Sequence, residues 1–130
     1  MKAFVAGLLM IAGAAHADET AIQGVIDGQM TAFLAEDVDT AFGYAGPGIR
    51  SMFGTPDNFG RMVAQGYPMV WRPANVEFLT TRQTGAGWRQ DVLVTDAEGR
   101  LHKLAYTMIE TADGWKIAGV QVLTAPEVGV

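Results

Sequence analysis

The fold is decided by residues 42–73, which read FGYAGPGIRSMFGTPDNFGRMVAQGYPMVWRP. This segment holds four of the five prolines of the chain, and proline is strongly disfavoured inside helices and central strands. Before the segment, apolar residues recur at the spacing of an α-helix, and after it they alternate as they do in β-strands. We therefore predict a helical half and a sheet half that meet at this hinge.

The clearest helix is predicted over Thr20–Ala35. Thr20 and Gln23 fit a capping box, in which each residue can bond the backbone N–H of the other at the start of a helix. Gly24 and Gly28 each weaken a helix by about 1 kcal/mol relative to alanine. We therefore expect another backbone, from the sheet or a second helix, to approach them closely. The apolar face of this helix consists of Ile22, Val25, Ile26, Met30, Phe33 and Leu34.

Shorter helices are predicted inside the hinge and on its N-terminal side. Asp37 is placed to cap a helix over Val38–Ala45, where an early carboxylate suits the helix dipole. Thr55 and Pro56 fit the N-cap and first position of a further helix that ends at Gly66. The helical half therefore contains about three helices.

Four strands are predicted after the hinge, because the apolar period changes there from 3.6 residues to 2. The links between them are short and rich in glycine and aspartate, as β-hairpins require. The result is an antiparallel meander, and the chain is predicted to be an α+β domain with its helices packed on a curled four-stranded sheet. The predicted strands are Val76–Gln83, Trp88–Thr95, Leu101–Glu110 and Trp115–Thr124.

The last two predicted strands carry apolar residues on both faces. A sheet that packs on helices from one side only should alternate apolar with polar residues, so we expect the second face to be covered as well. We predict a homodimer through this open sheet face. We assign Leu104, Tyr106, Met108, Trp115 and Ile117 to one face, and Leu101, Ala105, Ile109, Ala118, Val120 and Val122 to the other.

The first 17 residues are typical of a secretory signal peptide. Lys2 is followed by an apolar run over residues 3–14, and Ala15-His-Ala17 is a small-residue cleavage pattern. The alternative is a buried N-terminal helix. We predict cleavage after Ala17, a single domain over residues 18–130, and a periplasmic or secreted location. No later stretch is apolar and long enough to span a bilayer, so we expect no membrane insertion after cleavage.

Composition excludes several classes of partner and chemistry. The formal net charge of −5 argues against nucleic acid and anionic membranes as partners. The chain has no cysteine, which excludes disulfides and thiol catalysis. Ser51 is the only serine, and it does not lie in a nucleophile elbow. His102 is the only histidine left after cleavage, so we expect neither a metal site nor a cofactor.

Several segments resemble a bacterial family known as domain of unknown function 4864. They are Ala45–Arg50, Phe53–Pro56, Gly66–Pro68, Trp71–Pro73 and Gly114–Gly119. That family is similar to the nuclear-transport-factor-2-like, or SnoaL-like, cone folds. The resemblance implies about three helices against a curled sheet and a cone-shaped cavity. It implies no activity, because those folds include isomerases, dehydratases, binding modules and inert adaptors.

Asp91 is the weak candidate for a catalytic residue. It lies in the middle of a predicted strand, on the same side as Leu93. If that side faces the cone, burial would raise the pKa of Asp91 and suit it to carry a proton. If that side faces outward, Asp91 is an ordinary cross-strand partner of a cation, which is the interpretation that we favour. The acidic run Glu36-Asp-Val-Asp39 is interpreted as helix capping and solvation, with a divalent-cation site as the alternative.

The candidates for ligand binding are Tyr44, Arg50, Tyr67, Trp71 and Tyr106. An arginine in the hinge could hold a substrate carboxylate, or it could tie loop carbonyls to helix ends, and the same holds for Arg72. The tyrosines could donate hydrogen bonds to a developing oxyanion, or they could fill the core with one satisfied hydroxyl. In both cases the structural role is the interpretation that we favour.

These observations favour a non-catalytic domain that binds a small apolar or amphiphilic ligand or a partner protein. One alternative is an isomerase or dehydratase with Asp91 as base and Tyr67 or Tyr106 as hydrogen-bond donor. Another is a structural homodimeric adaptor whose cone is filled by its own side chains. Cavity volume separates the first and third readings, since a ligand site typically needs about 300 Å³ or more.

Overall fold

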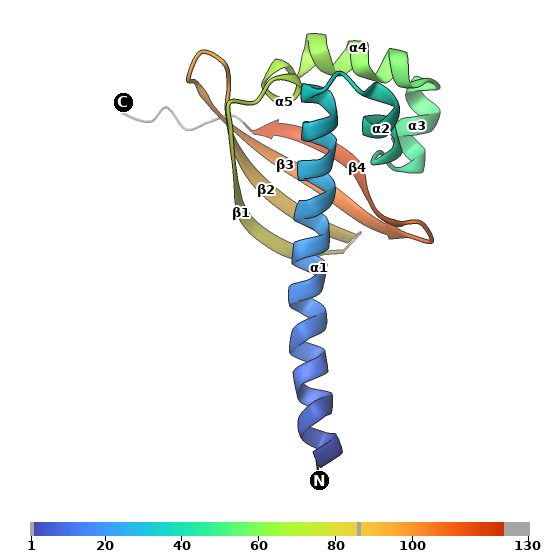
Figure 1. Cartoon of the computed structure of the whole chain (residues 1–130), viewed down its shortest axis with the longest axis vertical. Coiled ribbons are helices and arrows are strands. Elements are labelled where there is room, and N and C mark those ends of the chain that lie inside the picture. Colours follow the sequence, from blue (N-terminus) through green and yellow to red (C-terminus); the bar gives the residue numbers. More distant parts are fainter. Residues whose placement is uncertain (1, 86, 124–130) are drawn as a thin grey trace.

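Helices occupy the first half of the chain and an antiparallel sheet the second, as the sequence predicts (Figure 1). The computed structural model describes residues 2–85 and 87–123, with the backbone alone for residues 2–15. The long first helix crosses one face of the sheet, and the shorter helices gather at one end of it. The α+β class and its order of elements are therefore confirmed.

Helix α1 (Lys2–Leu34) is longer than predicted, because it begins near the chain start and runs without a break. Thr20 consequently lies inside the helix, and the predicted capping box is wrong for the uncut chain. The Gln23 amide instead donates to Thr81 Oγ1 at 3.4 Å and to Gln90 Oε1 at 3.3 Å. The upstream residues contain no proline and many strong helix formers, so nothing in the sequence ends the helix there.

Gly24 and Gly28 of α1 differ from each other. A Cβ atom at Gly28 would lie 2.6 Å from Tyr44 Oη, whereas one at Gly24 would meet nothing within 4 Å. A close approach therefore occurs at Gly28 only, and it comes from a side chain, not from a backbone. It brings α1 against the turn that follows α2.

Four shorter helices follow α1 in the described residues: α2 (Val38–Gly43), α3 (Pro47–Phe53), α4 (Pro56–Gly66) and α5 (Pro68–Trp71). The predicted caps are confirmed: the Asp37 side chain accepts from Thr40 N, and the Thr55 hydroxyl accepts from Asn58 N. Proline occupies the first position of α3, α4 and α5, where a missing N–H costs nothing. The hinge is thus more helical than expected, and α5 was not predicted.

The sheet has strand order β1-β2-β3-β4, with every neighbouring pair antiparallel. Its strands are β1 (Asn75–Thr84), β2 (Gly87–Thr95), β3 (Leu101–Thr111) and β4 (Gly114–Leu123). The four predicted strands are confirmed, although Thr124 lies outside the described residues. In the register, Gln90 lies opposite Tyr106, and Tyr106 lies opposite Val120.

A β-bulge in β4 corrects the predicted faces. Thr107 pairs with Gly119 while Met108 pairs with Ile117, so Ala118 is an extra residue. Because one extra residue shifts the alternation, Val120 and Val122 lie on the same face as Tyr106 and not on the opposite one. The outer face is therefore less apolar than the pattern on which we based the prediction of a homodimer.

The homodimer stays a prediction. The outer face of the sheet still carries Leu101, which is 60% exposed, together with Ala105. Charged residues, Arg89 and Asp91 among them, share that face with the apolar side chains. Light scattering at micromolar concentration would show whether the protein is a monomer or a dimer in solution.

Candidate ligand-binding site

An apolar pocket of about 210 Å³ lies between the shorter helices and the inner face of β4. It opens near Met52, which is 75% exposed although it lines the pocket. We call it the apolar pocket and define it by Gln29, Phe33, Ile49, Met52, Phe53, Phe59, Met62, Val63, Tyr67, Val70, Ile117 and Val120. Its volume is below the range of about 300–1,000 Å³ that is typical of sites for drug-sized ligands, so the volume criterion stated above argues against such a ligand and leaves room only for a smaller molecule.

Phe59 fixes one wall of the apolar pocket. Its ring packs against Phe33 of α1 at 5.8 Å, Phe42 of α2 at 5.6 Å and Phe53 of α3 at 5.9 Å between centroids. Tilted aromatic pairs at such distances are favourable beyond the area that they bury. Three helices are thereby held against α4. The pocket is therefore bounded by a packed aromatic cluster.

Two polar side chains line the apolar pocket, and neither is charged at neutral pH. Gln29, only 4% exposed, donates from Nε2 to Ala41 O at 3.1 Å. Tyr67 donates from its hydroxyl to Val120 O over a long 3.5 Å. A pocket with this lining favours an uncharged ligand, because nothing in it would compensate the desolvation of a charge.

Of the five predicted ligand-binding residues, Tyr67 alone lines the apolar pocket. Tyr106 is fully buried, and its hydroxyl has no hydrogen-bond partner among the described residues. Burial, and secondarily the charge of an ionised Tyr67, raises the pKa of Tyr106 above its ordinary value. Tyr106 therefore fills the core, which agrees with its structural interpretation except that the hydroxyl is unsatisfied.

Tyr44 and Trp71 serve the packing of α1. The Tyr44 ring covers Gly28, and its carbonyl accepts from Ile117 N at 2.9 Å. Trp71 packs on Phe33 with 5.5 Å between ring centroids. Neither of these two residues lines the apolar pocket.

Arg50 and Arg72 of the hinge also lie away from the apolar pocket. Arg50 stacks over Phe42 at 5.4 Å and borders a separate polar hollow with Lys116 and Asp113. Arg72 donates to the carbonyls of Phe33 and Trp71, each at 2.7 Å. Arg72 thus has the structural role of tying helix ends together.

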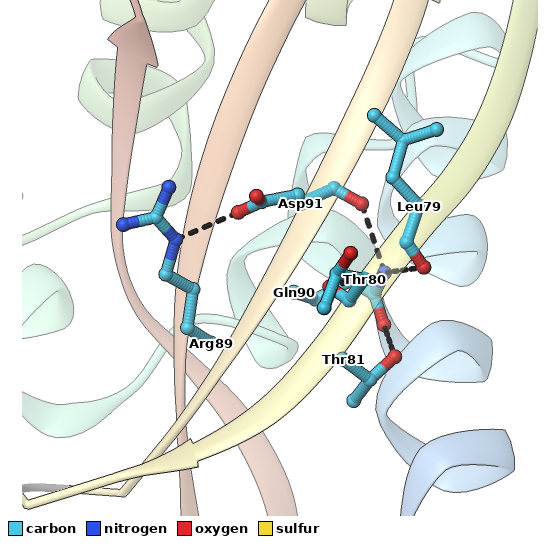
Figure 2. A network of polar contacts seen from close by, with 6 residues as sticks. All are labelled: Leu79, Thr80, Thr81, Arg89, Gln90 and Asp91. Atoms are coloured by element: carbon cyan, nitrogen blue, oxygen red, sulfur yellow. Dashed lines mark hydrogen bonds and ion pairs between the residues drawn. The ribbon is translucent and has the colours of Figure 1, made fainter.

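Asp91 lies on the outer face of the sheet, opposite to the side of its neighbour Gln90 (Figure 2). Its Oδ1 accepts from Arg89 Nε at 2.7 Å, and the residue is 8% exposed. Asp91 is therefore the partner of a cation, as we favoured, although the cation comes from its own strand. It does not line the apolar pocket, so the geometry does not support its role as a base there.

Several other titratable residues serve local structure. His102 Nε2 contacts Asp96 Oδ2 at 2.8 Å across the β2–β3 turn. This hydrogen bond, followed by that from Arg100 N, holds the pKa of Asp96 below its ordinary value. In the acidic run, Asp37 caps α2 and Glu36 pairs with Arg72 at 2.7 Å.

Metal-binding clusters and membrane-spanning helices are both absent from the part of the chain that the structure describes. The His, Asp and Glu side chains of that part form no group of three or more that could hold a metal ion. Among the described helices, none combines the length and apolar character that crossing a membrane requires.

Sequence reasoning missed Gln29 and the inner-face position of Val120. Gln29 had a usable signal, because it lies three residues after Ile26 and four before Phe33 on the apolar face of α1. A polar residue within an apolar stripe needs a buried partner. Val120 gave no such signal, since its orientation depends on the bulge at Ala118.

The profile of one protein family, described as "Domain of unknown function (DUF4864)", matches residues 15–130. The chain belongs to this family. A solved structure that it resembles is an NTF-2 like protein of unknown function from Burkholderia xenovorans LB400, with 17% sequence identity and a TM-score of 0.49. The match covers 84% of this chain and 90% of that one. No curated protein matches the chain.

Proposed function

We propose that this DUF4864 chain is a non-catalytic periplasmic or secreted domain that holds a small, mostly apolar molecule in the apolar pocket. The observation that carries the proposal is the lining of the pocket, which combines three phenylalanines with aliphatic and methionine side chains and contains no charged group. An apolar hollow of about 150 Å³ in a protein core can bind benzene, so about 210 Å³ suits a molecule of slightly larger size.

The absence of an assembled acid–base pair supports a binding role over catalysis. Among the lining residues, Tyr67 is the only one with a titratable side chain. Proton abstraction needs a base within hydrogen-bond reach of the reacting atom, and Asp91 lies on the other face of the sheet. The isomerase reading therefore has no base at this pocket.

A secreted location is part of the same proposal. In Figure 1 the first half of α1 extends beyond the sheet, and from His16 onward, where side chains are described, the first buried residue is Ile22. An N-terminal segment that adds nothing to the described core fits a cleavable leader.

The test of the binding role is a titration of the protein with p-xylene, followed by NMR. A ligand this small is expected to bind with a dissociation constant on the order of 0.1–1 mM. Val120→Phe fills the pocket from β4 and should abolish binding. Gln121→Phe is the matched control, because it places the same ring on the exposed opposite face of the strand.

Binding that survives Val120→Phe, or no binding to the unaltered protein, would contradict the proposal. In the second case the small pocket volume favours a structural adaptor whose cone is largely filled by its own side chains. A protein partner would then replace the small ligand.

A further inference from the structure

Gln29 has an amide oxygen that the fold leaves unused. Its Nε2 donates to Ala41 O, and a carbonyl can only accept, so the orientation of the amide is fixed by this partner. The opposite atom, Oε1, receives no hydrogen bond from any described residue. The residue is only 4% exposed and lines the apolar pocket, yet Oε1 is not fully enclosed, since Tyr106 Oη is the one fully buried side-chain atom without a partner among the described residues.

The two ends of the amide therefore differ in their use. Nε2 serves the fold, because leucine or methionine at position 29 would leave Ala41 O without this donor. Oε1 keeps its acceptor capacity, and a donor that enters the pocket can use it.

We propose that the ligand of the apolar pocket is a small uncharged alcohol or phenol whose hydroxyl donates a hydrogen bond to Gln29 Oε1. This inference rests on the proposed function and specifies the class of ligand. A hydroxyl both donates and accepts. The ligand hydroxyl can also accept a hydrogen bond from Tyr67. This residue lines the same pocket, and its hydroxyl makes only a long bond to Val120 O, at 3.5 Å.

Other donors fit the lining less well. An ammonium group would be charged, and no carboxylate lines the pocket to pair with it. A primary amide brings two N–H donors and a strong acceptor. The lining has only two polar side chains, so one of these three groups would stay without a partner. A single hydroxyl on an apolar body matches both the number and the type of the polar groups.

The test compares p-cresol with p-xylene, which differ by a hydroxyl in place of a methyl group. Both are titrated by NMR into the unaltered full chain and into Gln29→Met, and the ratio of the two dissociation constants is measured. We expect the preference for p-cresol over p-xylene to fall about three- to tenfold in Gln29→Met, because a typical hydrogen bond contributes this much. The side-chain amide signals of Gln29 should shift with both aromatic compounds, but more with p-cresol, whose hydroxyl forms the hydrogen bond.

The outcomes separate this inference from the proposed function. If both compounds bind and the ratio is the same in Gln29→Met, the pocket is a binding site but hydroxyl recognition is overturned. If neither binds the unaltered chain, the proposed function fails, and this inference fails with it.

A ligand-side comparison covers the case in which Gln29→Met does not fold. 4-Methylanisole keeps the oxygen of p-cresol but cannot donate a hydrogen bond. It should bind the unaltered chain no more tightly than p-xylene, and affinity equal to that of p-cresol would overturn the inference.

Discussion

Gly24 and Gly28 lie about one turn apart on α1 and offer a matched pair of substitutions. Gly24→Ala should raise the free energy of unfolding by about 0.5–1 kcal/mol, because alanine is the better helix former and the new Cβ meets nothing within 4 Å. Gly28→Ala should lower it by about 1–3 kcal/mol, because the Cβ would lie 2.7 Å from Tyr44 Cζ. Urea denaturation measures both. Equal stabilisation by the two would mean that the Tyr44 ring moves aside freely.

Tyr106 carries a buried hydroxyl that the described residues leave without a partner. Tyr106→Phe keeps the ring and removes the unpaired group, so we expect the free energy of unfolding to stay equal or to rise by about 1–2 kcal/mol. Thermal and urea denaturation of the variant test this. Tyr67→Phe provides the comparison, since the Tyr67 hydroxyl has a partner in Val120 O. A marked loss of stability in Tyr106→Phe would show that its hydroxyl is hydrogen-bonded in solution.

At the scale of residues, the sequence identified local roles better than site roles. The caps at Asp37 and Thr55 were predictable because their partners lie three residues away. The positions of Asp91 and Gln29 relative to the pocket were not, because they depend on which face of a strand or helix meets a distant element. Local spacing determines a cap, but only tertiary packing determines a pocket.

At the scale of elements, the bulges escaped prediction. In β1 the register shifts between Phe78 and Thr81, and the Gln90 side chain occupies the irregularity from β2 (Figure 2). Its Nε2 lies 3.4 Å from both Leu79 O and Thr80 O. Period-2 patterns predict that a strand exists, but one extra residue reverses every later side chain without altering composition.

Gln90 is predicted to hold this bulge in place. Gln90→Met should lower the free energy of unfolding by about 2–3 kcal/mol, because it leaves the buried Asp91 carbonyl of β2 and a partly buried carbonyl of β1 without their donor. Urea denaturation gives the loss, and faster hydrogen exchange should be confined at first to the middle of β1. Gln83→Met, at an exposed position of β1, serves as the control and should change stability by less than about 0.5 kcal/mol. Similar effects of the two substitutions would assign no special role to Gln90.

At the scale of the whole molecule, the order of elements followed from the change in period near Pro73. All four strands and their antiparallel order were predictable, because short glycine-containing links permit only hairpins. The start of α1 was predicted at Thr20, where a capping pattern occurs, but the uncut helix begins at Lys2. The predicted start at Thr20 and the observed start at Lys2 agree if the capping pattern acts only in the processed chain.

We expect the processed chain to begin at Asp18, with Thr20 as the N-cap of a shortened α1. Thr20→Ala should then lower the free energy of unfolding of residues 18–130 by about 1 kcal/mol, because the cap is lost. In the uncut chain Thr20 is an exposed mid-helix residue, so the same substitution should be neutral or slightly stabilising. Mass spectrometry of the secreted protein locates the new N-terminus, and urea denaturation of both forms gives the two effects. An uncleaved product, or the same effect of Thr20→Ala in both forms, would contradict this account of the N-terminal segment.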